Sequence, residues 1–250
     1  NHFPQIDLIA LNDNLGFTGA NNIGIHKAMQ AGADYVALLN NDTRVEPDWL
    51  DALVEVAERD PEIAICAAQQ RTWDGECVIR FRFIPEWAEA EAVHIPVGTP
   101  DIVKPAPFAS GCAMLLRCDI LEQIGLFDDR YFAYVEDVDL TLRAWIAGYK
   151  AFLVPQSIVY HRFGGSADSQ QKMFWGYRNQ LTTILKLYQI ETIRTFASAI
   201  ANRWFLTRNR TAFRATLAAF AMMPGTLARR ARIQQIRKRN DSEFLKMDTL

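Results

Sequence analysis

Residues 35–42 read YVALLNND, an unbroken apolar run that stops at two asparagines and an aspartate. A short run of this kind, bounded by turn-forming residues, predicts a strand that is buried in a sheet. Upstream, residues 6–11 (IDLIAL) predict a second short buried strand. A glycine-containing turn follows, and residues 23–32 predict a helix that ends at Gly32.

Downstream, Pro47 opens a predicted helix that runs to about Arg59, since proline is favoured in the first helical turn. Residues 63–68 predict the next strand. This alternation of strands and helices predicts an α/β protein with a parallel, doubly wound sheet. The remaining predictions are a hairpin and long loop in 72–107, strands in 112–117, 151–154 and 158–160, and helices in 119–124 and 136–147.

The 250 residues are 50% hydrophobic, which suits one sizeable core and an appendage. The net charge of −2 hides a division of the chain. Residues 1–170 contain 12 Lys/Arg and 25 Asp/Glu, whereas residues 171–250 contain 15 Lys/Arg and 4 Asp/Glu. We therefore predict an acidic body in 1–168 and a basic, helical, amphipathic tail in 169–250 that favours anionic surfaces.

The four cysteines have neither CxxC spacing nor companion histidines, which predicts reduced thiols and a cytoplasmic protein. The chain begins without a secretory signal pattern. The longest uncharged run of the tail, residues 215–228, is shorter than the roughly 20 apolar residues that a membrane span needs. We therefore expect peripheral attachment to the inner face of the plasma membrane rather than insertion.

Ligands of open α/β sheets bind at the carboxyl ends of strands, where the sequence places several polar groups. Asp42 follows an apolar strand and suits a divalent cation, although its position alone slightly favours a turn or helix cap. Glu136, Asp137 and Asp139 begin a helix, either as caps or as a group whose repulsion raises one pKa. His161 ends a strand, where it is either structural or a metal ligand.

Five ordered segments together resemble the family-2 inverting glycosyltransferases, especially the rhamnosyltransferase-like bacterial branch that builds polysaccharides. They are NDNLGFTGANN (12–22), LLNNDT (38–43), SGCAMLLR (110–117), GLFDDRYFAYVEDVDLTLRAWIAGY (125–149) and VPQSIVYHRFGGS (154–166). The resemblance implies a GT-A fold, a Rossmann-like mixed sheet flanked by helices. Family members begin with strand, helix and strand, and only ten residues precede Leu11, so we expect the first strands to be missing.

The resemblance also implies a role for each residue that matches a family motif. It makes Asp137 the catalytic base and assigns the acceptor to Glu136, Ser110 and Gly111. It assigns the nucleotide-diphosphate sugar donor to Asn14, Gly16, Asn22 and Asn41, and a Mg²⁺ or Mn²⁺ ion to Asp42 and His161. The implied function is inverting transfer of a sugar to a hydroxyl of a glycan or lipid-linked acceptor.

Two other functions compete with this interpretation. A chain that lacks the first strands of the fold could be a non-catalytic nucleotide-sugar or interaction module. A basic tail with interspersed aromatic residues could bind nucleic acid. The tail aromatics recur at helical intervals with leucine and isoleucine, which favours a membrane interface over nucleic acid.

Overall fold

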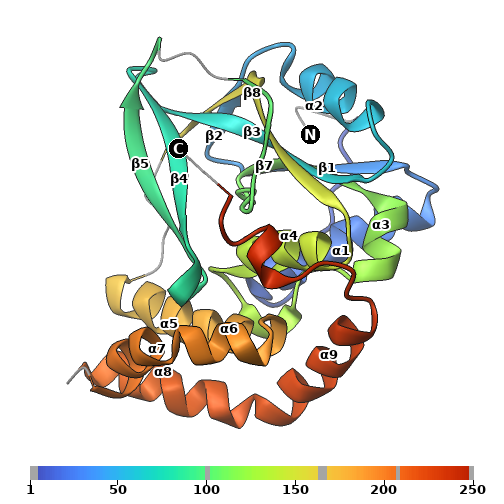
Figure 1. Ribbon diagram of the computed structural model, residues 1–250. Helices are drawn as coiled ribbons and strands as arrows, with labels where there is room; N and C mark the ends of the chain where they lie inside the picture. Colours follow the sequence, from blue (N-terminus) through green and yellow to red (C-terminus); the bar gives the residue numbers. More distant parts are fainter. Residues whose placement is uncertain (1–4, 99–101, 163–167, 207–208, 248–250) are drawn as a thin grey trace.

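The computed structural model describes residues 5–98, 102–162, 168–206 and 209–247. A mixed sheet lies at the centre, with helices on both faces (Figure 1). Its strands are β1 (Tyr35–Leu39), β2 (Thr43–Val45), β3 (Ile63–Thr72), β4 (Cys77–Ile84), β5 (Glu89–Pro96), β6 (Lys104–Pro105), β7 (Ala113–Arg117) and β8 (Lys150–His161). The α/β class and the mixed sheet that the family resemblance implies are both confirmed.

The sheet is mostly antiparallel, so the prediction of a parallel, doubly wound sheet is wrong. β7 lies between β1 and β3 and is antiparallel to both, β4 is antiparallel to β3 and β5, and only β8 is parallel to β3. Strand direction is not encoded in hydrophobic periodicity, because a strand that is covered on both faces is apolar in either direction. The predicted hairpin is present as β4 and β5, joined by the short helix η1 (Pro85–Trp87).

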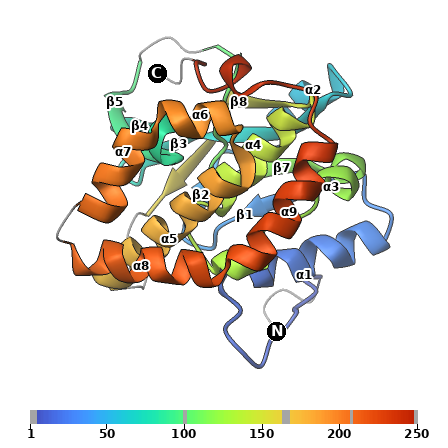
Figure 2. The same ribbon diagram turned by 60° about the horizontal axis from the view of Figure 1, so that its bottom comes forward.

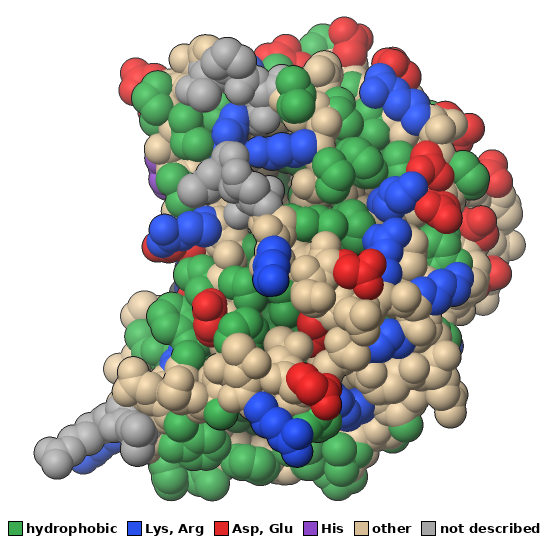
Figure 3. Space-filling model, viewed as in Figure 1, with side chains coloured by type: hydrophobic (Ala, Val, Ile, Leu, Met, Phe, Trp, Pro, Cys, Tyr) green, Lys and Arg blue, Asp and Glu red, His purple; other side chains and the backbone are tan. Residues whose placement is uncertain are grey.

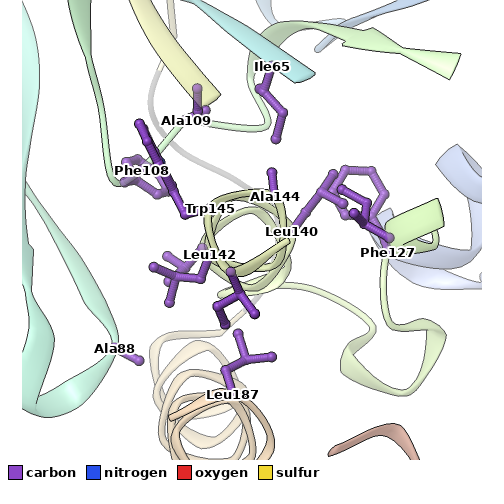
Figure 4. Packing of buried hydrophobic residues seen from close by; sticks show 14 of the residues in the cluster. Ile65, Ala88, Phe108, Ala109, Phe127, Leu140, Leu142, Ala144, Trp145 and Leu187 are labelled. Atoms are coloured by element: carbon purple, nitrogen blue, oxygen red, sulfur yellow. The ribbon is translucent and has the colours of Figure 1, made fainter. Parts of the chain in front are cut away.

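The central strands are apolar throughout because both of their faces are covered. Cys66 and Ala68 of β3 and Leu115 of β7 pack with α2 (Trp49–Glu58). The alternate residues of the same strands point to the opposite face, where α4 (Glu136–Ile146) is buried. Figure 4 shows Ile65, Ala109, Phe127 and Leu187 converging on α4 from four directions. This packing fixes the position of the acidic amino end of α4 relative to the sheet.

The first segment of the chain differs from its prediction. Residues 6–11 form neither strand nor helix, and their apolar side chains are exposed, up to 81% for Leu8. An apolar run becomes a buried strand only when a neighbouring strand pairs with it, and this segment has no such neighbour in the described part of the chain. Helix α1 (Gly16–Gln30) begins within the predicted turn and ends before Gly32, whose φ is +81°.

Two predicted short strands merge into one. β8 runs through Pro155 with a shift of register against β3, which a sequence pattern broken by proline and serine did not reveal. Helix α3 (Cys118–Ile124) and the helix at 136–146 lie where they were predicted. All four cysteines are free thiols.

The basic segment beyond residue 168 is helical, as predicted. It contains α5 (Ser169–Leu187), α6 (Ile190–Thr195), α7 (Ala197–Ala201), the π-helix η3 (Asn202–Leu206), α8 (Arg210–Ala221), α9 (Met223–Gln235) and the short helix η4 (Asp241–Glu243). Helices α8 and α9 pack against α5 (Figure 2). Leu181, Ile184 and Trp204 belong to the same hydrophobic cluster as α4, so this segment and the sheet share one core. Within the described ranges, no helix is long and apolar enough to cross a bilayer.

Charged groups are also buried where α4 meets α5. The Lys186 ammonium lies 2.7 Å from carboxylate oxygens of both Asp128 and Asp139, and Arg143 lies 2.9 Å from Asp139. All four side chains are at most 5% exposed. Asp139, the third acid of the predicted cluster, therefore holds α4 against α5 and takes no part in lining the cavity that Glu136 and Asp137 line.

Candidate active site

A cavity of about 1080 Å³ lies where the ends of the central strands meet the amino end of α4. Most of the residues predicted from the sequence to form the site line it: Asn14, Gly16, Asp42, Ser110, Gly111, Glu136, Asp137 and His161. Asn22 and Asn41 are not among its lining residues. Predicted site residues as far apart in the sequence as Asn14 and His161 are thus brought into one concave site, which is where small-molecule sites are expected.

Asp42 and His161 are placed together by strand pairing. β2 begins directly after Asp42 and runs antiparallel to β8, so that Thr43 lies opposite His161. Asp42 Oδ1 is 3.2 Å from His161 Nε2, and this buried oxygen accepts no hydrogen bond from any residue that the structure describes. A carboxylate and an imidazole on one wall fit a divalent cation such as Mn²⁺. No cluster of three or more His, Cys, Asp or Glu suited to a metal occurs in the described ranges.

Asp137 is held by backbone amides at the start of α4. The Gly111 N–H donates to its Oδ2 at 3.0 Å, and the Val138 N–H donates to its Oδ1 at 2.9 Å. Burial raises the pKa of this carboxyl, and the two amide donors partly oppose the rise. A Cβ on Gly111 would lie 3.0 Å from the Phe17 ring, so a larger residue there would require that ring to shift. The carboxylate is thus oriented, partly shielded from water and more basic than an ordinary aspartate.

Glu136 is the more deeply buried of the two adjacent acids. Its Oε2 has no hydrogen-bond partner in the described part of the chain, and the side chain lines the cavity. Burial raises its pKa well above the usual range, and the neighbouring charge of Asp137 adds to the rise. A buried carboxyl with one oxygen left over is suited to bind a hydroxyl group that enters the cavity.

The charges of Asp42 and Asp137 both affect Cys112, which lies between these two residues in the sequence. Burial raises the pKa of the Cys112 thiol to about 12, and the charges of Asp42 and Asp137 contribute to the rise. Cys112 also lines the cavity. The candidate metal ligand and the candidate base therefore share one wall, although they come from different strands and helices.

The loop before Glu136 is strained. Phe132, Tyr134 and Val135 have φ values of 66°, 69° and 71°, a region that costs roughly 1–3 kcal/mol for each such residue. The buried amide of Asn179, on α5, donates to the carbonyls of Tyr131, Ala133 and Tyr134 at 2.7–3.1 Å. Strain of this kind persists only where the surroundings hold it, and here it is held directly beside the two acids.

The predicted donor-binding turn forms the first turns of α1. The Asn14 side chain accepts a hydrogen bond from the Gly16 N–H, and a Cβ on Gly16 would lie 2.4 Å from the Phe132 carbonyl oxygen. Asn22 is used differently, because its amide exchanges two hydrogen bonds with the Phe127 backbone. Asn22 thus ties α1 to the loop that leads to α4.

Sequence reasoning missed one wall of the cavity. Trp175 and Tyr177 on α5 line it, and the Trp175 ring lies 4.7 Å from the Phe132 ring and is stacked on the Tyr134 ring at 6.3 Å. Arg203 of the π-helix also lines it and is paired with Glu89 at 2.7 Å. The sequence showed these residues only as members of a basic aromatic segment, and nothing in their spacing indicated that α5 turns back to the sheet.

Comparison with known proteins bears directly on this arrangement. The family described as glycosyl transferase family group 2 matches residues 35–229, which include β1, α4 and most of the basic helices. The chain belongs to this family of glycosyltransferases. The match continues past residue 168, in agreement with a core that the sheet and the basic helices share.

Curated relatives include rhamnosyltransferases. The N-acetylglucosaminyl-diphospho-decaprenol L-rhamnosyltransferase of Mycobacterium tuberculosis is 30% identical over 64% of this chain and 59% of its own length. The dTDP-rhamnosyl transferase RfbF of Shigella flexneri is 22% identical over 64% of this chain and 53% of its own length. The chain therefore spans somewhat more than half the length of these relatives.

Solved structures of GT-A glycosyltransferases share the fold. GalNAc-T7, with UDP, GalNAc and Mn²⁺, superposes with a TM-score of 0.63 at 15% identity, over 95% of this chain and 44% of its own. The mannosyltransferase PcManGT of Pyrobaculum calidifontis, with GDP-Man and Mn²⁺, has a TM-score of 0.51 at 14% identity, over 92% and 68%. The GT-A fold implied by the sequence motifs is thereby confirmed.

Proposed function

We propose that this glycosyltransferase moves a sugar, with inversion, from a nucleotide-diphosphate sugar to a hydroxyl of a glycan or lipid-linked acceptor during polysaccharide synthesis. The observation that carries the proposal is the position of Asp137. Its carboxylate is held by two backbone amides in a cavity that also contains the Asp42 and His161 pair. A base and a candidate cation site on one wall are what a single displacement on a diphosphate sugar requires.

Asp42 and His161 are the residues that would hold a divalent cation, Mg²⁺ or Mn²⁺. Asp42 Oδ1, which has no hydrogen-bond partner among the described residues, and the adjacent imidazole supply two possible metal-binding atoms, and both solved neighbours contain Mn²⁺. A mixed carboxylate and imidazole set favours Mn²⁺ over Mg²⁺. When bound, the cation would neutralise charge on the departing nucleoside diphosphate.

The acceptor hydroxyl is activated by the acidic end of α4. Asp137 takes the proton of the acceptor hydroxyl while the hydroxyl oxygen forms a bond to the anomeric carbon. In the same step, the bond between that carbon and the diphosphate breaks. Because burial raises the pKa of Asp137, its carboxylate is a stronger base than a solvated one. Glu136 and the Ser110 and Gly111 segment line the same space and would position the acceptor.

The relatives suggest the chemical class of the substrates. The names of the two rhamnosyltransferases specify a dTDP-linked rhamnose donor in one and a diphospho-decaprenol acceptor in the other. A third relative, an O-antigen biosynthesis protein of Myxococcus xanthus, is 28% identical over 56% of this chain and 12% of its own length. We therefore propose a deoxyhexose donor and an acceptor of the polyprenyl diphosphate sugar class, with the aromatic wall around Trp175 as the surface for sugar rings.

The test is a donor and acceptor assay with and without Mn²⁺. Nucleoside diphosphate release from dTDP-rhamnose is expected to require both Mn²⁺ and a polyprenyl diphosphate sugar, and the product is expected to have the opposite anomeric configuration. The Asp137→Asn variant should still bind the donor but lose transfer about 10²–10⁴-fold. Donor binding without any transfer by the wild-type protein would instead support a non-catalytic nucleotide-sugar module.

A further inference from the structure

Helix α8 buries its small residues and exposes its large apolar residues, which is the reverse of an ordinary surface helix. Its small residues, Ala212, Ala215, Thr216 and Ala219, are buried against the rest of the protein. Its large apolar residues, Phe213, Leu217 and Phe220, are 60%, 55% and 47% exposed. A helix that only supported the fold would turn these residues inward, because burying each of them contributes roughly 1.5–3 kcal/mol.

The exposed apolar surface extends beyond one helix. Phe205, 54% exposed, lies with its ring 6.4 Å from that of Phe220, and Leu227 of α9 is 55% exposed. Figure 3 shows hydrophobic side chains gathered along the lower rim, where Figure 1 places α8. We call Phe205, Phe213, Leu217 and Phe220 the apolar face. Contiguous exposed residues of this size mark an interaction surface.

The charge around the apolar face indicates the kind of partner. Arg210 and Arg214 are exposed on α8 one turn apart from Phe213 and Leu217. Residues 192–240 contain eleven Lys or Arg and no Asp or Glu. The apolar side chains are thus bordered by arginines within a stretch of 49 residues that contains no acid. This arrangement complements a surface with anionic groups on the outside and an apolar layer beneath them.

The apolar face is also close to the mouth of the active-site cavity. Asn209, which caps α8 by accepting from the Thr211 and Ala212 amides, donates through its own amide to the Met173 sulfur at 3.7 Å. Met173 is 43% exposed and lines the cavity. The amino end of α8, which carries Arg210, therefore lies beside a solvent-exposed residue of the cavity lining.

We infer that the apolar face and its flanking arginines dock the protein onto an anionic lipid bilayer, with α8 lying in the interface. Phe213, Leu217 and Phe220 enter the boundary of headgroups and acyl chains, while Arg210 and Arg214 contact lipid phosphates. This orientation would bring the cavity mouth at Met173 toward the membrane surface. Docking requires neither donor nor acceptor, so it stands apart from the proposed transfer reaction.

Co-sedimentation with lipid vesicles tests the inference. We expect the protein to bind vesicles of phosphatidylglycerol and phosphatidylcholine more tightly than phosphatidylcholine alone, and to be released by high salt. The triple variant Phe213→Ser, Leu217→Gln and Phe220→Ser should bind at least tenfold more weakly. Arg210→Gln and Arg214→Gln should each weaken binding about fivefold at low salt. Substitutions suit this test better than truncation, because α5 and Trp204 belong to the core.

The matched control is Leu8→Ser with Ile102→Ser, which removes two apolar residues that are more exposed and lie outside the basic helices. This control should bind vesicles as the wild type does, and all variants should unfold at similar urea concentrations. Equal binding by the triple variant and the wild type, or no binding by either, would overturn the inference. Two other results would also overturn the inference. One is a dimer that forms without lipid and that the triple variant cannot form, and the other is oligonucleotide binding that competes fully with vesicles, because each would show that a different partner occupies the apolar face.

Discussion

Replacing Asn179 by leucine should disable transfer without unfolding the protein. The side-chain amide donates to the carbonyls of Tyr131, Ala133 and Tyr134, and it is completely buried. An amide nitrogen has two hydrogens, so its three contacts are worth about two full bonds. Each buried carbonyl left unpaired costs roughly 1–3 kcal/mol, which gives about 4 kcal/mol if the loop stays in place.

The loop is not expected to stay in place. Phe132, Tyr134 and Val135 are held at positive φ at a cost of roughly 1–3 kcal/mol each, so relaxation of the loop recovers about half of the energy that the lost bonds cost. The stability of Asn179→Leu should therefore fall by only about 2 kcal/mol in urea unfolding. Because the loop leads directly into Glu136 and Asp137, a displacement of about 1 Å should lower kcat roughly 100-fold.

The assay compares kcat, KM and urea midpoint for Asn179→Leu and a control, Thr182→Val. Thr182 is similarly buried on α5, but among the described residues its hydroxyl donates within its own helix, to the Arg178 carbonyl. The control should lose a similar amount of stability and keep its kcat. If Asn179→Leu retained wild-type kcat, or if both variants lost kcat alike, the amide would not be positioning the acids.

Three further predictions concern charge. Lys186→Met should lower the free energy of unfolding in urea by about 3–5 kcal/mol, because it leaves the buried Asp128 and Asp139 carboxylates without their shared partner. Lys27→Met, which breaks an exposed ion pair, should change it by less than about 1 kcal/mol. The base must be unprotonated, and burial raises the pKa of Asp137. As the pH is lowered, kcat should therefore begin to fall at a higher pH than it would with a solvated aspartate, and a profile that is flat down to pH 4 would contradict this. Asp42→Asn should weaken Mn²⁺-dependent donor binding measured by calorimetry, and unchanged Mn²⁺ affinity would remove Asp42 from the metal site.

Sequence patterns predicted the local elements of the core well and the arrangement of the sheet poorly. The apolar runs that became β1, β3 and β7 are covered on both faces, so their composition alone identified them. The direction of β7 depends on which strand it pairs with, which no local pattern encodes. The segment 6–11 has the same composition as these strands but lacks a paired neighbour in the described structure, and so forms no strand.

Most of the candidate site was predictable because its residues lie in motifs. Asp42, His161, Glu136 and Asp137 lie at or beside the ends of regular elements, and the fold brings those element ends together. The contributions of α5 were not predictable, because Trp175 and Asn179 reach the site only through helix packing. Their side chains are typical of a basic amphipathic helix, and only the shared core shows that the helix belongs to the catalytic body.

The proposed function makes Asp137 the base of a metal-dependent, inverting transfer. The most direct measurement is the pH profile of single-turnover transfer from dTDP-rhamnose to a polyprenyl diphosphate sugar, for the wild type and for Asp137→Asn, in the presence of Mn²⁺. We expect an acid limb for the wild type, at least a 100-fold lower plateau for the variant, and unchanged donor affinity. Transfer by Asp137→Asn at the wild-type rate and with the same acid limb would contradict it.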